Sequence, residues 1–178
     1  MTMTAANDVT ADLVTTMGFR FSVRPVTPAD SEALKGLFAH MSKDDLRFRF
    51  LSAVKEVSAK QIEAMTNVDH TRTEDFLAFE PGSQRIIANA VLAGDKKLEI
   101  AEVAVAVDSD FKDRGIEATL LEHVAAYARL HGFKKLQAIE SRENHAMIEA
   151  ESTLGFVAKG IEGDASLVML EAKLDKAA

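Results

Sequence analysis

One stretch near the middle of the chain, residues 107–132 (VDSDFKDRGIEATLLEHVAAYARLHG), combines residue types that suit the binding of an anion. An apolar strand-like run ends where it starts, a loop with one glycine follows, and a helical pattern begins at residue 114. The start of a helix offers unpaired backbone N–H groups and the positive end of the helix dipole. Gly115 allows a close backbone approach, and Lys112 and Arg114 flank it. These features predict a phosphate site, although an ordinary loop at a helix start explains them equally well.

A second candidate for chemistry is a lone acid, Glu102, the single charged residue in the apolar run IAEVAVAV at 100–107. On a central strand its apolar neighbours would raise its pKa towards neutrality, because burial disfavours a charged carboxylate. Such a group can act as a general base and take a proton from an ammonium group, directly or through a water molecule. The same residue is equally consistent with a solvent-facing position on a half-exposed strand, which is where we expect Glu99.

The composition excludes several other kinds of chemistry. The 178 residues include no cysteine, which rules out disulfides, thiolate metal sites and a cysteine nucleophile. The five histidines lack the spacing of helical zinc motifs, so we expect no metal. The net charge of −7 argues against a nucleic-acid partner, which would need a surface that follows phosphates.

Nothing in the sequence predicts a membrane segment or a secretion signal. The longest uncharged stretch, residues 86–94, is about half of the ~18 residues that a membrane helix needs. The first part of the chain, MTMTAANDVTADLVTTM, lacks the basic region and the apolar core of a signal peptide. We therefore expect a cytoplasmic protein without a membrane partner, in which residues 1–18 form a mobile arm.

The remaining residues, 19–174, alternate between strand and helix periods without a repeat or a linker, which predicts a single α/β domain. Short turns join three strand-like runs into an antiparallel meander, and a helix then crosses over to a parallel strand. The predicted order is β-α-α-β-β-β-α-β-α-β-β, with one further short helix before the meander, in a mixed, mostly antiparallel sheet of about seven strands. Strands are expected at 19–26, 75–79, 85–92, 98–107, 133–140, 156–161 and 166–174, and helices after 28, near 43–50 and 59–66, over 114–131 and near 145–154.

The stretch at 107–117 resembles a motif of the GNAT N-acetyltransferases, enzymes that use acetyl-CoA. Their strand is followed by V-x-P-x-aromatic and then by (Q/R)-x-x-G-x-(G/A), where this chain has VDSDF and KDRGIE. Residues 144–156 (NHAMIEAESTLGF) are similar to the family's N-x-x-(A/M)…LGF segment. More narrowly, MSKDDLRFRFLS, NVDH, AEVAV and ENHAM look like the acyltransferase domain of Pat-type bacterial protein-lysine acetyltransferases. The likeness covers about residues 20–173.

This resemblance implies a GNAT fold with helices on both faces of the sheet. It also implies direct transfer from acetyl-CoA to a primary amine, with a protein lysine favoured over a small amine. Glu102 matches the acid of the family's A-E-F-A motif and so would be the general base. Asn144 would bind the pantetheine arm or cap the helix that follows it, and Arg49 would line the entrance or simply pack with its charge outward. The other residues implied in cofactor binding are Val105, Ala106 and Val107 for the pantetheine and Lys112, Asp113, Arg114, Gly115, Ile116 and Glu117 for the pyrophosphate.

Two residues depart from the family's pattern. Glu117 stands where the family has a small residue, and its charge would repel a pyrophosphate about 5 Å away by roughly 1–3 kcal/mol. The helix dipole alone also favours an acid in the first turn. Glu151 stands where many members have a tyrosine that protonates the departing thiolate, a role that a thiol with a pKa of about 8.5 can do without. Glu117 therefore supports an alternative function, a catalytically weak or inactive GNAT module that senses CoA species or binds a protein partner.

Overall fold

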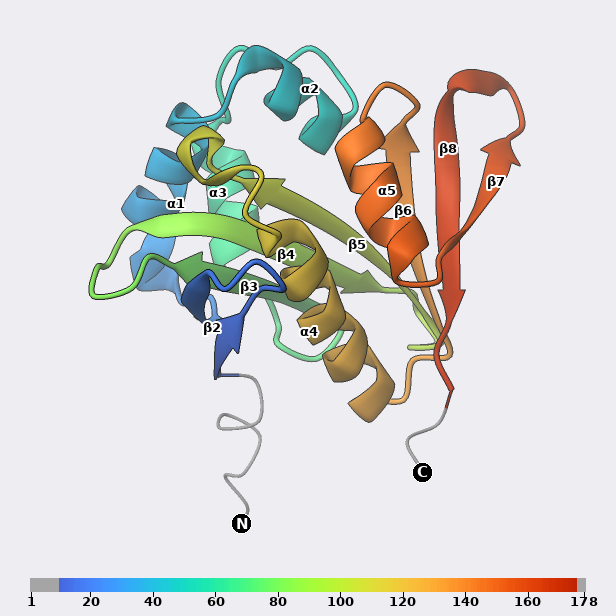
Figure 1. Cartoon of the computed structure of the whole chain (residues 1–178), viewed down its shortest axis with the longest axis horizontal. Coiled ribbons are helices and arrows are strands. Elements are labelled where there is room, and N and C mark those ends of the chain that lie inside the picture. The colour runs from blue at the N-terminus through green and yellow to red at the C-terminus, as the bar shows by residue number, and fades with distance from the viewer. Residues whose placement is uncertain (1–9, 176–178) are drawn as a thin grey trace.

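The computed structural model describes residues 10–175, which form a mixed, mostly antiparallel sheet of eight strands with helices on both faces (Figure 1). The strands lie in the order β1-β2-β3-β4-β5-β6-β8-β7. Their bounds are β1 Ala11–Val14, β2 Arg20–Pro25, β3 Thr73–Phe79, β4 Ile86–Gly94, β5 Ile100–Val107, β6 Lys135–Ser141, β7 Val157–Ile161 and β8 Asp164–Lys173. The helices are α1 Ser31–Ala39, α2 Lys43–Phe50, α3 Ala59–Thr66, α4 Ile116–Leu130 and α5 His145–Thr153, with 3-10 turns η1 Pro28–Asp30 and η2 Ser109–Phe111.

The eighth strand, β1, lies within the segment that the sequence analysis assigned to a mobile arm. Residues 11–14 pair antiparallel with β2, with Ala11 opposite Val23 and Val14 opposite Arg20. A tight turn closes this hairpin, in which the Thr15 N–H donates to the Phe19 carbonyl. The expectation of an arm is therefore wrong for residues 11–14, and residues 1–9 lie outside the described part of the chain. This strand has no clear signal in the sequence, because ADLV is short and alternates only weakly between apolar and polar residues.

The sheet separates between β5 and β6. These two strands are parallel, as predicted for a helical crossover, but they pair only from Ile100 opposite Lys135 to Glu102 opposite Gln137. Beyond that point β6 continues against β8 alone, and β5 continues against β4 alone. Within residues 10–175 no strand pairs with the β6-facing edge of β5 after Glu102. The backbone N–H and C=O groups of residues 103–107 on this edge therefore remain available to a ligand.

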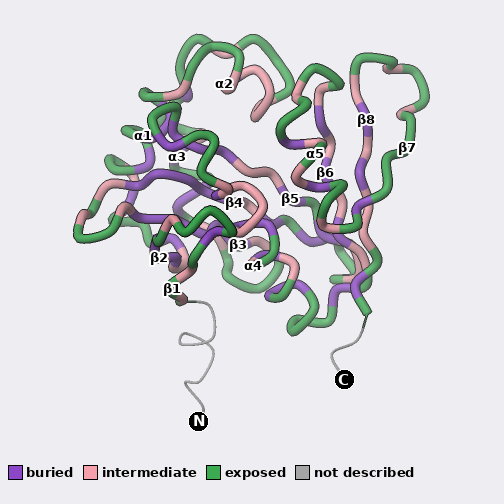
Figure 2. Tube along the Cα trace, viewed as in Figure 1, coloured by how far each residue is buried: buried purple, intermediate pink, exposed green. Residues whose placement is uncertain are grey.

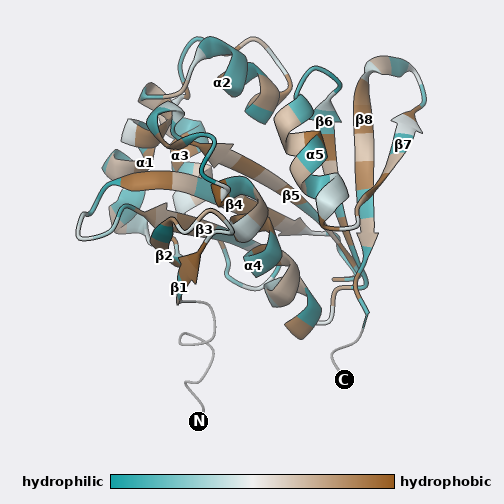
Figure 3. Ribbon diagram, in the orientation of Figure 1, coloured by the Kyte–Doolittle hydropathy of each residue, from teal (hydrophilic) through white to brown (hydrophobic). Residues whose placement is uncertain are grey.

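The strands of the sheet are largely buried and apolar (Figures 2 and 3), and a cluster of apolar side chains lies on each face of the sheet. On one face α4 and α5 pack against the strands, where Val103 of β5 belongs to a cluster with Leu120 and Val124 of α4. On the other face α1, α2 and α3 cover the first part of the sheet, where Ala106 of β5 clusters with Leu37 of α1. Alternate residues of β5 thus face two different layers of helices, which fixes the direction of every side chain on that strand.

The helix starts follow the capping residues seen in the sequence. Ser42 accepts a hydrogen bond from the Asp45 N–H at the start of α2, and Ser58 with Gln61 forms a capping box at the start of α3. Gly132 follows α4 with φ of 84°, a left-handed backbone that glycine adopts without strain. No helix among the described residues is long and apolar enough to cross a membrane.

Candidate active site

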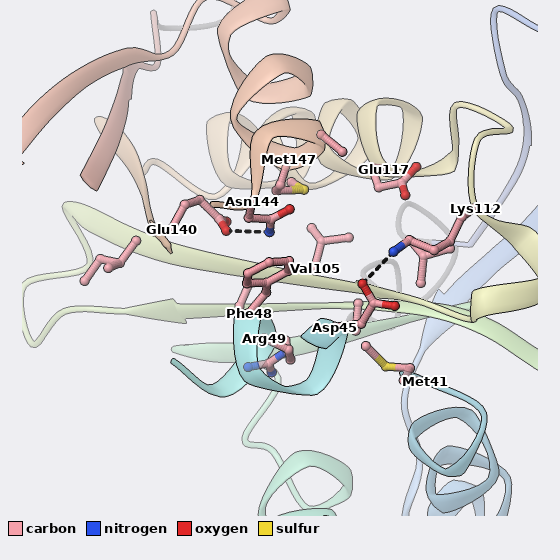
Figure 4. Close-up of a pocket in the computed structure, with 15 residues that line it drawn as sticks. Met41, Asp45, Phe48, Arg49, Val105, Lys112, Glu117, Glu140, Asn144 and Met147 are labelled. Carbon is pink, nitrogen blue, oxygen red and sulfur yellow. Dashed lines mark hydrogen bonds and ion pairs between the residues drawn. The ribbon is translucent and has the colours of Figure 1, made fainter. Parts of the chain in front are cut away.

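A cleft opens where β5 and β6 separate (Figure 4). One wall is residues 104–107 of β5, and the opposite wall is the end of β6 and the start of α5, with Glu140 and Asn144. Helix α2 covers the cleft with Arg49 among its lining residues, and Lys112 lines it from the loop before α4. We call the end at Lys112 the outer end of the cleft, and the end where β5 and β6 pair the inner end.

The outer end is built around the start of α4. Gly115 is the residue before the helix, with φ of 79°, and a Cβ there would lie 3.3 Å from the Thr15 Cβ. Glycine is therefore favoured at this position both by the backbone angle and by the close approach of the β1–β2 turn. Lys112 reaches across the cleft, and its Nζ donates to the Asp45 Oδ1 of α2 at 2.5 Å. The predicted phosphate loop thus has the expected backbone, while its lysine is already paired with an acid.

Three further residues of the predicted phosphate loop do not line the cleft with their side chains: Asp113, Arg114 and Ile116. The Arg114 guanidinium lies over the Phe111 ring at 4.7 Å and over the Phe19 ring at 5.1 Å. Asp113 is exposed, and Ile116 is fully buried in the core. Ile116 can offer a ligand only its backbone groups. Fewer side chains therefore reach the cleft than the sequence motif predicts.

Glu117 lines the outer end of the cleft, close to Lys112 (Figure 4). Its side chain is half-buried, and burial raises the pKa of this carboxyl, while the nearby ammonium of Lys112 lowers it. The carboxylates of Asp113 and Asp45 add to the increase. Glu117 thus faces the space at the start of α4, and it gives up a proton less readily than an ordinary glutamate.

The wall formed by β6 and α5 carries two buried acids. The Asn144 Nδ2 donates to the Glu140 Oε2 at 3.0 Å, and Glu140 is only 6% exposed (Figure 4). Asn144 precedes α5 but its side chain makes no capping hydrogen bond, so of its two predicted roles only a place in the cleft is observed. Behind Glu140 lies Glu151 of α5, which is fully buried. Burial raises the pKa of both carboxyls, and the charge of Glu140 raises that of Glu151 further.

An open strand edge, a glycine at the start of a helix and a cleft running between them suit an extended ligand with an anionic end. The sequence profile of the Acetyltransferase (GNAT) family matches residues 45–156, which include all of these elements. The chain belongs to this family. It is a GNAT acetyltransferase, and the family uses acetyl-CoA together with an amine acceptor.

Individual relatives point in the same direction. Acetyltransferase PA5475 of Pseudomonas aeruginosa is 28% identical over 149 residues, which are 83% of this chain and 80% of that protein. Acetyltransferase Pat of Mycolicibacterium smegmatis is 29% identical over 152 residues, 85% of this chain, and this chain spans only 45% of that protein. The crystal structure of the GNAT domain of S. lividans PAT has a TM-score of 0.87 at 28% identity, covering 96% of this chain and 99% of that chain. The chain is therefore related to the GNAT domains of Pat-type acetyltransferases.

Glu102, the predicted GNAT base, does not lie among apolar neighbours. It is exposed, as is Ala93 directly opposite it on β4. Glu102 points to the α1–α3 face of the sheet, as Ala104 and Ala106 do, but at this position no helix covers that face. Of the two positions that the sequence allows for Glu102, the structure shows the exposed one, because the alternation of β5 determines which face Glu102 occupies and leaves open whether a helix covers it.

Helix α2 is tied to both walls of the GNAT cleft. Asp45 pairs with Lys112 at the outer end, and the Arg47 Nη2 donates to the Glu143 Oε2 at 2.7 Å in the loop before α5. Exposed ion pairs of this kind contribute little stability, typically about 0.2–1 kcal/mol each. The two pairs hold the helix over the cleft without fixing it strongly.

Arg49, predicted to lie at the entrance, does line the cleft from α2. Its Nε is buried and has no hydrogen-bond partner among the described residues. Burial lowers the pKa of this guanidinium, and the carboxylates of Asp75, Glu140 and Glu102 act in the opposite direction. Arg49 thus provides a positive charge that acts on Glu140 and Glu102.

Two residues of the site, Glu140 and Asp45, were not singled out from the sequence. Glu140 could have been found from the alternation of β6, since Leu136, Ala138 and Glu140 share one face of that strand and the first two are fully buried. Asp45 had no signal, because its partner Lys112 is 67 residues away in the chain. In the sequence Glu151 stands out only as a departure from the family's pattern.

Proposed function

We propose that this GNAT acetyltransferase transfers the acetyl group of acetyl-CoA directly to the side-chain amine of a protein lysine. The observation that carries the proposal is the separation of β5 from β6, which leaves a free strand edge leading to the glycine at the start of α4. The likeness to acetyltransferase Pat and to the GNAT domain of S. lividans PAT supports a protein lysine as the acceptor. The chain has no cysteine that could carry the acetyl group between two steps, which supports direct transfer.

In this proposal each part of the cleft has one task. The backbone of residues 105–107 binds the amide groups of the pantetheine arm along the open edge of β5. The N–H groups at the start of α4, with Lys112, bind the pyrophosphate. Asn144 contributes a polar side chain to the opposite wall. The thioester then lies towards the inner end of the cleft. On one side of it is the point where the pairing of β5 with β6 ends, and on the other side is the loop at the outer end.

Glu102 takes the proton from the lysine ammonium, directly or through a water molecule. The free amine attacks the thioester carbonyl carbon, a C–N bond forms, the C–S bond breaks, and the electron pair goes to sulfur. Glu102 is exposed, so it can pass the proton on to solvent after each turnover. The open sheet face around it also leaves room for an acceptor as large as a protein segment.

A second candidate function is a CoA-sensing or partner-binding module with little catalysis. Glu117 favours it, because this carboxyl lines the outer end of the cleft where the pyrophosphate would lie. The pairing of Lys112 with Asp45 also favours this second function, because the ion pair occupies a cation that would otherwise bind the pyrophosphate. Against it, the raised pKa of Glu117 and the partial exposure of the Lys112–Asp45 pair both reduce the cost of binding an anion there.

Calorimetric titration with acetyl-CoA tests whether the protein binds the cofactor. An assay of CoA release, which detects the free thiol, then tests whether it catalyses transfer. Because this chain contains no cysteine, a thiol reagent detects only the released CoA when the acceptor also lacks cysteine. We expect binding, and CoA release that depends on a lysine-containing peptide or protein. Absence of binding at millimolar acetyl-CoA would overturn the transferase and the CoA sensor, and would leave only a module that binds a protein partner. Binding without release in the presence of proteins, lysine peptides or polyamines would favour the sensing module.

A further inference from the structure

The two buried acids in the wall of the cleft have no role in the transfer described so far. Glu151 is fully buried in α5, and neither of its carboxyl oxygens has a hydrogen-bond partner among the described residues. The group that faces it is the carboxyl of Glu140, itself only 6% exposed. Two buried carboxylates in contact would be strongly destabilising if both were charged. The pair therefore holds at least one proton.

The two acids differ in what surrounds them. Only Glu140 lines the cleft, where its Oε2 accepts a hydrogen bond from Asn144 and where the positive charge of Arg49 on α2 favours its ionised form. Glu151 has no such partner, so it is the harder of the two to ionise. When the pair loses one proton, the charge settles on Glu140, and Glu151 remains protonated as a donor to it.

The position of Glu140 along the cleft matches the position of the reacting sulfur. It lies three residues beyond Gln137, the last residue of β6 that pairs with β5. A pantetheine arm that enters at Lys112 and follows β5 inwards ends in this region, where the two strands come together. This placement rests on the proposed function, because it assumes that acetyl-CoA occupies the cleft.

We propose that Glu140 donates the proton that the CoA sulfur takes up as it leaves, and that Glu151 positions Glu140 and stabilises its carboxylate. As the C–S bond breaks, its electron pair goes to sulfur, the O–H bond of Glu140 breaks and an S–H bond forms. The resulting Glu140 carboxylate accepts hydrogen bonds from protonated Glu151 and from Asn144. The amine loses its protons to Glu102 and solvent, and Glu140 regains its proton from water in the cleft. Glu140 is thus a catalytic residue and Glu151 a positioning residue.

The first test is the variant Glu140→Gln, assayed by CoA release under saturating acceptor. We expect kcat to fall by roughly 10- to 100-fold, at or below the low end of general acid catalysis because a thiolate leaves fairly readily. The KM for acetyl-CoA should change less than about threefold, since no binding group is lost. In the unaltered enzyme kcat should decline as the pH rises and Glu140 loses its proton, and the variant should lack this decline. Glu149→Gln on the exposed side of α5 is the matched control.

A second pair of variants keeps the proposal testable if Glu140→Gln does not fold. In Glu151→Met the new side chain is similar in volume to glutamate but has no hydrogen-bond donor. The pKa of Glu140 therefore rises, and the decline of kcat moves to higher pH. Glu151→Gln keeps an N–H donor and should largely restore the original profile. If Glu140→Gln and Glu151→Met both keep the kcat and pH profile of the unaltered enzyme, the proposal is wrong. If the unaltered chain itself releases no CoA from acetyl-CoA with any amine, the proposed function fails and this proposal fails with it.

Discussion

The two ends of the cleft differ in how far their charged residues are exposed to water. At the outer end Lys112, Asp45 and Glu117 are half-buried or exposed. Lys112 and Asp45 form an ion pair across the cleft. At the inner end two acids, Glu140 and Glu151, are buried against each other, while Glu102 stands in the open. Water screens the charges at the outer end, so their effect on binding is small. At the inner end burial governs which groups are ionised, and the effects on chemistry are correspondingly large.

The largest effect is expected at the inner end, from the exposed acid. Glu102→Gln removes the proposed base and should lower kcat by roughly 10²–10³-fold with little change in acetyl-CoA affinity. Steady-state kinetics with calorimetry measures both quantities. Glu99→Gln, a neighbouring acid that pairs with Lys134 outside the cleft, is the control. A Glu102→Gln enzyme with full activity would remove Glu102 from its proposed role.

The buried pair should also affect stability in a direction that depends on pH. Burial raises the pKa of Glu151 well above its ordinary value, so the unfolded chain gives up this proton more readily than the folded one. The contribution of protonated Glu151 to the free energy of unfolding is complete below pH ~4.5. It is lost as the pH rises towards the pKa that Glu151 has in the folded state. Glu151→Gln removes this loss, so we expect its Tm to exceed that of the unaltered protein by several degrees at pH 8 and much less at pH 4. Thermal melts at both pH values test this, and an equal Tm difference at both would contradict it.

At the outer end the effect of Glu117 on binding should be moderate. Glu117→Gln removes a negative charge from the proposed pyrophosphate site and should tighten acetyl-CoA binding by about 3- to 10-fold, within the range for a screened like-charge contact. Because the pKa of Glu117 is raised, binding by the unaltered protein should also tighten as the pH falls and this carboxyl becomes neutral. Calorimetry across pH measures both effects, with Glu122→Gln on the exposed side of α4 as the control. Unchanged affinity would show that the pyrophosphate lies elsewhere.

The smallest effect is expected from the pair that joins α2 to the outer loop. Asp45→Asn frees Lys112 for the pyrophosphate, and acetyl-CoA binding should tighten by about two- to threefold, as expected for an exposed ion pair. The gain should shrink at high salt because screening weakens the competing attraction. Asp44→Asn, one residue earlier on α2, leaves Lys112 paired and serves as the control. Weaker binding by Asp45→Asn would mean that the pair holds α2 in the shape that binds the ligand.

Local patterns were sufficient to predict most of the fold. Strand alternation, the capping residues Ser42 and Ser58 and the turn glycines located seven strands and the helices, and the crossover rule gave the parallel pairing of β5 with β6. The family of the chain was predicted as well, from the motif around Gly115 and the segment after Asn144. The strand β1 was missed because four weakly alternating residues need a partner strand to become ordered.

The sequence by itself determined which residues stand on β5, which loop precedes α4 and that no cysteine takes part, because these follow from residue type and local period. Only the tertiary structure decided which acids are buried. The sequence allows Glu102 either a buried or an exposed position, and the structure shows it exposed, whereas Glu140 and Glu151 are both buried in the wall of the cleft. Burial depends on which elements, distant in the chain, cover a side chain, and the ionisation of an acid follows burial. The acid–base chemistry of this site is therefore a property of its packing.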